Sequence, residues 1–244
     1  MSALRYVYAI CRPFPAALSA ELTGVAGVPP RLLRHDDLVA VVGSVPERDF
    51  DAEPLRRRLE DVHWLEATAR AHQGVIDALT VVTSPLPLRL ATVLRDDSGV
   101  RVMIDERRED FLRTLDRLDG RVEWDVRVYA ESAREQADAF TRRLHETLSG
   151  GAEESRVLTP GDPATSHEAC PGAGGRRILD AAYLVPRADS GAFVERVNGV
   201  GEEPGTRVEL TGPWAAYSFT GSTGLTGFAG VTGFTGLTSC GCTG

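Results

Sequence analysis

The pattern of hydrophobic and polar positions is clearest in RVEWDVRV (121–128), where charged and apolar residues alternate strictly. The apolar positions are Val122, Trp124, Val126 and Val128, and the charged positions are Arg121, Glu123, Asp125 and Arg127. A period of two places successive side chains on opposite faces of a strand. The segment therefore predicts a β-strand with one apolar face and one charged face.

Three other stretches repeat apolar residues at steps of three and four, which is typical of amphipathic helices. The first contains Leu55, Leu59, Val62, Leu65, Ala69, Ile76 and Leu79, with His72 in its one gap; the second contains Val100, Ile104, Phe111, Leu115 and Leu118; the third contains Ala133, Ala137, Phe140, Leu144 and Leu148. We expect one long helix over 53–79, a second over 99–118, and a third after the alternating strand.

Shorter elements are predicted between these stretches. β-Branched and aromatic residues favour strands at 5–11, 178–185 and 206–212, and a short strand near 156–158. The segment RLLRHDDLVAVVGSV (31–45) predicts a hairpin that turns at residues 35–37. We also expect an extended segment at 84–93, a short helix at 190–200, and another at 15–24 that ends at Gly24.

The order of these elements predicts the fold class. Residues 121–219 follow the order β-α-β-β-α-β, which is that of a ferredoxin-like fold, and the first 95 residues alternate similarly. We therefore expect an α+β protein of two lobes. The N-terminal α+β domain occupies 1–98, a connecting helix 99–120, and the ferredoxin-like C-terminal domain 121–219, with a flexible loop at 149–176.

The end of the chain has a different pattern, with a glycine at every third position from Gly221 to Gly236. The spacing is collagen-like, but the repeat has no proline and is too short for a triple helix. We expect residues 220–244 to be a disordered, low-complexity Gly-X-Thr tail. The alternative is a row of apolar side chains that contacts another surface, formed by Leu225, Phe228, Val231, Phe234 and Leu237.

Charge and composition narrow the function. The net charge is −8 over 244 residues, and an acidic balance argues against nucleic-acid binding, because phosphate binding needs a basic surface. The most apolar region, 78–94, contains Pro85, Pro87 and Arg89, which argues against a membrane span. Four cysteines are too few for a disulfide framework in a chain of this length. We expect a cytoplasmic protein that binds neither nucleic acid nor membrane.

No motif supports an enzyme, since the Walker A loop, GxGxxG, HExxH and GxSxG are all missing from the sequence. His63 and His72 would lie about 13–14 Å apart along a helix, too far to share a metal ion. His72 continues the apolar stripe and is expected to be a hydrogen-bonded histidine in the core or at its boundary. Arg89 either points to the solvated face of its strand or pairs with a buried carboxylate. We expect no catalytic residue, no metal site and no cofactor.

Three aromatic residues follow the last strand in LTGPWAAYSF (210–219). Strand pairing is expected to end at Pro213, which has no N–H, and Gly212 permits a turn. Two alternatives remain open for Trp214, Tyr217 and Phe219. They fold over the lobe and close its structure, or they form an exposed anchor for a protein partner.

Six stretches together resemble the gas vesicle protein F/L family. In chain order they are RYVYAIC, DDLVAVVGSVP, ARAHQGVIDAL, PLPLRLATVLRDD, ILDAAYLVPR and LTGPWAAYSF, spanning about residues 4–219. The last is the most specific, although Ala215 and Ala216 stand where members of the family commonly have two prolines. The resemblance marks His72, Pro87, Arg89 and Tyr183 as motif positions with an expected structural role. It marks Pro213, Trp214, Tyr217 and Phe219 as a candidate partner-binding site or structural clamp.

The resemblance implies an accessory protein that helps to build gas vesicles, the gas-filled protein shells that give some prokaryotes buoyancy. It implies two α+β domains, the second a modified ferredoxin-like one, and no enzymatic activity. The implied partners are the small, very hydrophobic major shell protein and other gas vesicle accessory proteins, in the cytoplasm or at the vesicle. The competing interpretation is a ferredoxin-like regulatory protein that binds a small molecule, or an enzyme, because such lobes have many functions.

Overall fold

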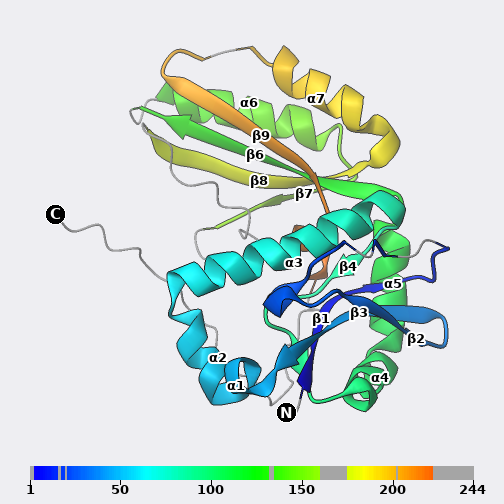
Figure 1. Ribbon diagram of the computed structural model, residues 1–244. Coiled ribbons are helices and arrows are strands. Elements are labelled where there is room, and N and C mark those ends of the chain that lie inside the picture. The colour runs from blue at the N-terminus through cyan, green and yellow to red at the C-terminus, as the bar shows by residue number, and fades with distance from the viewer. Residues whose placement is uncertain are drawn as a thin grey trace. The chain divides into compact units, whose positions relative to one another are not determined.

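The computed structural model describes residues 3–15, 18–19, 21–131, 135–159, 175–201 and 203–221. They form two compact units, the first from residues up to Asp119 together with the segment that starts at Ala215, and the second from Gly120 to Trp214. The second unit is thus an insertion in the sequence of the first (Figure 1). The expected tail, beyond residue 221, and most of the expected flexible loop, at 160–174, lie outside the described residues.

The first unit contains one antiparallel sheet with the strand order β2-β3-β1-β4, and β5 also pairs with β1. Its strands are β1 (Ala3–Cys11), β2 (Arg31–His35), β3 (Leu38–Pro46), β4 (Leu86–Pro87) and β5 (Val93–Leu94). β1 is central because its apolar run is buried on both faces. The strand predicted at 5–11 corresponds to β1, and the hairpin predicted at 31–45 corresponds to β2 and β3, which turn at Asp36 and Asp37. Both predictions are confirmed.

Each of the two long helices expected in this unit is two helices, so the prediction of uninterrupted helices was wrong. The first becomes α2 (Ala52–Leu59) and α3 (Val62–Val82), and the second becomes α4 (Asp97–Glu106) and α5 (Arg108–Leu118); a one-turn helix, α1 (Glu47–Phe50), precedes them. The Asp61 carboxylate caps α3 by accepting the Trp64 N–H at 3.2 Å, and Arg107 has non-helical dihedral angles between α4 and α5. Apolar periodicity continues across both breaks, so it does not reveal them.

The short helix expected at 15–24 is also wrong for the described residues of that segment, 15, 18–19 and 21–24, none of which is helical. A short 3₁₀ turn, η1 (Val25–Gly27), follows instead. The core of this unit forms where α3 packs its apolar stripe on the sheet, with Val75, Ile76 and Leu79 fully buried.

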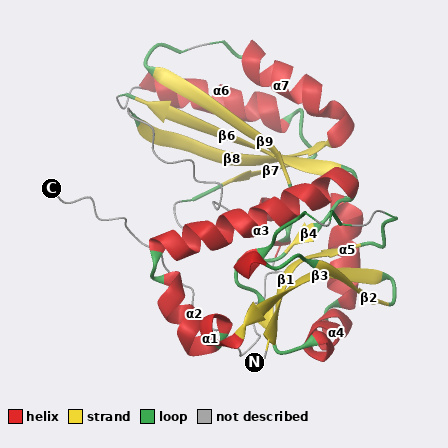
Figure 2. Ribbon diagram, viewed as in Figure 1, coloured by secondary structure: helices red, strands yellow, loops and turns green. Residues whose placement is uncertain are grey.

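The second unit has an antiparallel sheet with the order β7-β8-β6-β9 and two helices on one of its faces (Figure 2). Its elements in chain order are β6 (Arg121–Ala130), α6 (Glu135–Ser149), β7 (Glu154–Val157), β8 (Arg176–Pro186), η2 (Arg187–Asp189), α7 (Ser190–Gly199) and β9 (Thr206–Trp214). The apolar face of β6 packs against Phe140 and Leu144 of α6 and Phe193 of α7. The element order is the one that the sequence predicts.

The charged face of β6 is buried, which the alternation alone does not reveal. Glu123 is 0% exposed, and Asp125 and Arg127 are each 2% exposed. The Arg127 guanidinium lies 3.4 Å from the Asp180 carboxylate of β8 and 3.8 Å from that of Asp125. Burial raises the pKa of Asp125 to about 6, with the neighbouring guanidinium opposing the shift.

None of the described helices combines the length and the apolar character that a membrane-spanning helix requires.

Candidate functional site

The first half of the aromatic segment, Gly212 to Trp214, is the end of β9. Pairing continues to Trp214, which lies opposite Glu123, so the prediction that pairing ends at Pro213 was wrong. The register shifts here: Gly212 and Pro213 together oppose only Trp124, and this bulge carries the ladder past the residue that has no N–H. Gly212 has φ +137°, and a Cβ there would lie 2.9 Å from the Glu123 carbonyl oxygen, so the bulge requires glycine.

Pro213 and Trp214 retain access to solvent. Pro213 is exposed and Trp214 is partly exposed. The Trp214 indole Nε1–H donates to the Thr211 hydroxyl at 3.4 Å, which fixes the ring beside its own strand. Pro213 is thus exposed, and Trp214 is partly exposed, as is Tyr217 further along the segment.

The second half of the segment, from Ala215 to Phe219, belongs to the first unit and completes its core. Ala215 and Ala216 are each 3% exposed, Phe219 is 4% exposed, and the Tyr217 ring packs against the core. Arg117 of α5 donates a hydrogen bond to the Phe219 carbonyl oxygen. The segment thus divides between the end of β9 and the core of the first unit, a division that the sequence pattern does not reveal.

His72 is buried beneath this segment, in a cluster of tyrosines. Its Nδ1 is hydrogen-bonded to the Tyr6 hydroxyl at 3.0 Å, and the same hydroxyl oxygen accepts the Ala91 N–H at 3.0 Å. The ring centroids of Tyr8 and Tyr217 lie 5.5 and 6.5 Å from that of His72. With only 3% of the residue exposed, burial lowers the pKa of His72 to about 4, so the imidazole is neutral at pH 7. The expectation of a hydrogen-bonded core histidine is confirmed.

The other motif positions lie apart from this cluster. Pro87 is buried in β4, where it pairs with Ala9 of β1, and Arg89 is exposed, in agreement with the first of its two alternatives. Tyr183 is fully buried in β8, and its hydroxyl is hydrogen-bonded to the His145 ring at 2.7 Å. These positions have structural contacts, and the described residues do not combine them into one polar site.

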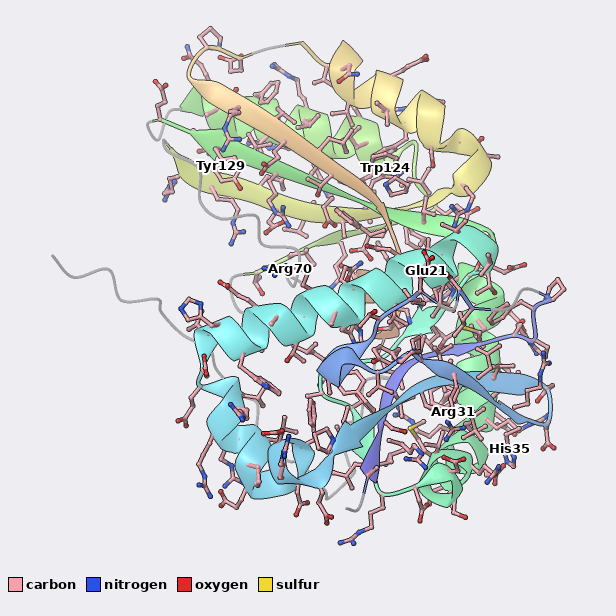
Figure 3. All side chains as sticks on the ribbon, in the orientation of Figure 1. Glu21, Arg31, His35, Arg70, Trp124 and Tyr129 are labelled. Carbon is pink, nitrogen blue, oxygen red and sulfur yellow. The ribbon has the colours of Figure 1, made fainter. Side chains whose placement is uncertain are left out.

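One cluster of polar side chains is not predicted by the sequence pattern. The possible ligand atoms of His35, Asp36 and Asp105 lie within 4.8 Å of one another. His35, labelled in Figure 3, is the last residue of β2. His35 Nε2 is 2.7 Å from the Asp105 carboxylate, so an ion pair or hydrogen bond accounts for the approach without a metal ion. Asp105 is 70 positions from His35, and no local pattern predicts the pair.

Asp96 has a different role, since it caps α4. Its carboxylate accepts the Gly99 N–H at 2.8 Å, as aspartate commonly does at the start of a helix.

Comparison with known proteins decides the family. The model of the family described as gas vesicle synthesis protein GvpL/GvpF matches residues 4–137 and 129–221. The chain belongs to the GvpL/GvpF family. It is 51% identical over 253 residues to gas vesicle protein L of Streptomyces sp. (strain CB03234), an alignment that covers 89% of this chain and 93% of that protein. It is 34% identical over 126 residues to gas vesicle protein F of the same strain, covering 50% of this chain and 47% of the relative.

Solved GvpF structures share the fold of this GvpL/GvpF family member. The crystal structure of GvpF from Anabaena sp. PCC7120 matches with a TM-score of 0.68 at 17% identity, covering 90% of this chain and 96% of that one. The crystal structure of GvpF from Microcystis aeruginosa matches with a TM-score of 0.64 at 16% identity, covering 89% and 98%. At these identities the likeness establishes a common mixed α/β fold with antiparallel sheets.

Proposed function

We propose that this protein is a non-enzymatic assembly protein that binds the small, hydrophobic major shell protein of gas vesicles, during nucleation of the shell or at its surface. Membership of the GvpL/GvpF family, whose description is gas vesicle synthesis, carries the proposal. The protein then acts in the cytoplasm and at the vesicle, with other accessory proteins as further partners. An acidic protein of net charge −8 is suited to keeping an apolar subunit in solution.

The division of the aromatic segment supports a contact surface at the end of β9. Trp214 is partly exposed next to the exposed Pro213, whereas Phe219 is buried. Tryptophan is enriched among the residues that dominate the binding energy of interfaces, because its large ring buries much apolar area. We therefore assign the partner contact to Pro213 and Trp214, and a structural role to Tyr217 and Phe219.

The domain organisation is part of the proposal. The sheet order β7-β8-β6-β9 with two helices on one face supports a modified ferredoxin-like domain in the second unit. The expected division into domains at 1–98 and 121–219, with 99–120 between them, remains a prediction. The grouping of α4 and α5 with the first unit favours a boundary near residue 120.

The competing interpretation, a small-molecule-binding regulator or enzyme, has less support. It would be favoured by a pocket that joins Arg89, His72 and an acidic residue from another segment. His72 instead contacts tyrosine rings in the interior of the first unit, and Arg89 is exposed.

Co-purification with the major shell protein tests the proposal. Trp214→Ala should retain several-fold less shell protein than the wild type while its melting temperature changes little. Val81→Ala is the matched control, because the Val81 residue is 83% exposed on α3 and its truncation also removes apolar surface. Phe219→Ala should lower the melting temperature, as expected for a core residue.

Two outcomes would contradict the proposal at different levels. Retention of wild-type amounts of shell protein by Trp214→Ala would refute the assignment of the contact to β9. Failure of the wild-type protein to retain any shell protein would refute shell-protein binding itself.

A further inference from the structure

The outer edge of β9 is not paired with any other described strand. β9 is the last strand of the β7-β8-β6-β9 sheet and, among the described strands, it pairs with β6 alone. It is nine residues long, whereas β7 at the opposite edge has four residues. An edge strand presents a row of unpaired backbone N–H and C=O groups on which another strand can pair.

The hydrogen-bond pattern identifies which residues present these groups. The Glu131 N–H donates to the Gly205 carbonyl oxygen at 3.0 Å, and these two residues lie opposite each other in the continuing β6–β9 register. In an antiparallel ladder, hydrogen-bonded and non-hydrogen-bonded pairs alternate. Residues 205, 207, 209 and 211 therefore direct their backbone groups toward β6. Thr206, Val208 and Leu210 direct theirs away from the sheet, although the Thr206 N–H donates to the Glu203 carbonyl oxygen.

The side chains of this edge differ between the two faces of the sheet. Val208 and Leu210 pack against the core on the helical face. Arg207 and Glu209 lie on the charged face with side-chain exposures of 50% and 26%. The Arg207 guanidinium stacks 4.4 Å from the ring centroid of Tyr129, whose hydroxyl donates to the Glu209 carboxylate at 3.1 Å. Figure 3 shows Tyr129 on the neighbouring strand β6. The edge therefore carries an ordered positive charge and an ordered negative charge two residues apart.

We propose that β9 pairs with β9 of a second copy of this chain, antiparallel and with Val208 of one copy opposite Val208 of the other. In this register Arg207 of each copy lies opposite Glu209 of the other, so two opposite-charge pairs form across the junction. Val208, Leu210 and Thr206 of each copy meet on the helical face. The outward groups of these three residues supply about four backbone hydrogen bonds, without the Thr206 N–H that the turn occupies.

Charge selects this register over its neighbours. Sliding one strand along the other by two residues keeps the side chains on the same faces. In one direction this shift places Glu209 opposite Glu209 of the other copy, and in the other direction it places Arg207 opposite Arg207. Like charges directly opposite destabilise a strand pair. Pairing of two edges buries less surface than a standard interface of about 1,600 Å², so the dimer is weak and forms in the micromolar to millimolar range.

Charge reversal tests the register with the full chain. Sedimentation of the wild type over roughly 5–500 µM should show a rising dimer fraction. Arg207→Glu and Glu209→Arg should each weaken self-association at least ten-fold, because each places like charges opposite each other. An equimolar mixture of the two variants should associate as a heterodimer, in which both pairs are again of opposite charge. Arg142→Glu, at an exposed position on α6, makes the same change in net charge as Arg207→Glu and should dimerise like the wild type.

The wild-type protein supplies a second readout that needs no variant. The amide protons of Val208 and Leu210 should exchange more slowly at high than at low protein concentration, whereas that of Glu209, already paired with β6, should not change. A wild type that stays monomeric throughout the range would overturn the proposal. A dimer that resists both charge reversals, or a mixture that does not associate, would overturn it as well.

Discussion

The buried histidine predicts how the stability of the protein depends on pH. Burial lowers the pKa of His72 from 6.5 to about 4 in the folded protein. The unfolded chain therefore binds a proton at His72 more readily than the folded protein does. The contribution of His72 to the free energy of unfolding is complete above pH 6.5 and is lost as the pH falls toward 4. A difference of about 2.5 pKa units lowers the free energy of unfolding by about 3 kcal/mol once the pH reaches 4. About 2.5 kcal/mol of this stability is already lost at pH 4.5.

The variant His72→Gln isolates this contribution. Glutamine does not titrate, and its side-chain oxygen is an acceptor for the Tyr6 hydroxyl. The free energy of unfolding, measured by urea denaturation, should fall between pH 7.5 and 4.5 by about 2.5 kcal/mol more in the wild type than in the variant. The carboxylates titrate in both proteins and cancel in the difference.

His63→Gln is the matched control, since His63 is exposed on the same helix. Its unfolding free energy should follow that of the wild type across the pH range. Parallel curves for the wild type and His72→Gln would refute the reasoning, because they would mean that acid does not charge a buried imidazole. Titration of the His72 ring by NMR provides the direct check, with an expected pKa of about 4.

Three further substitutions test the packing by urea denaturation. Tyr8→Phe should cost about 1–3 kcal/mol, because it removes the hydroxyl that accepts the buried Val25 N–H at 2.8 Å; an unchanged stability would argue for a water there. Gly212→Ala should cost about 1–3 kcal/mol through its φ of +137° and the contact with a β6 carbonyl oxygen, whereas Gly191→Ala, in open space on α7, should cost nothing. Asp96→Ala should cost about 1 kcal/mol through loss of the α4 cap, and an equal loss in Asp96→Asn would contradict the capping role.

Periodicity in the sequence predicts most elements of the fold because it reports which side of each element is buried. The alternation in 121–128 is β6, and its apolar residues face α6 and α7 as expected. Breaks within a periodic stretch are not visible in this way. The interruption before α3 depends on one carboxylate, that of Asp61, and on the local dihedral angles rather than on the apolar stripe.

The candidate site was less predictable because its contacts join distant parts of the chain. The types of residue in the aromatic segment were evident, but their division between two units depends on the whole fold. His72 was expected to lie in the core, whereas its partner Tyr6 is 66 positions away. The burial of Glu123, Asp125 and Arg127 was equally hidden, since an alternating strand with a solvated charged face has the same sequence pattern.

The insertion of the second unit has a consequence for synthesis of the protein. The ribosome makes residues up to Asp119 first, yet the alanines, tyrosine and phenylalanine that finish their core emerge only after Trp214. A premature stop codon shortly after position 214 would leave the later unit whole and damage the earlier one. Of the two units, the one that is synthesised earlier is thus completed later.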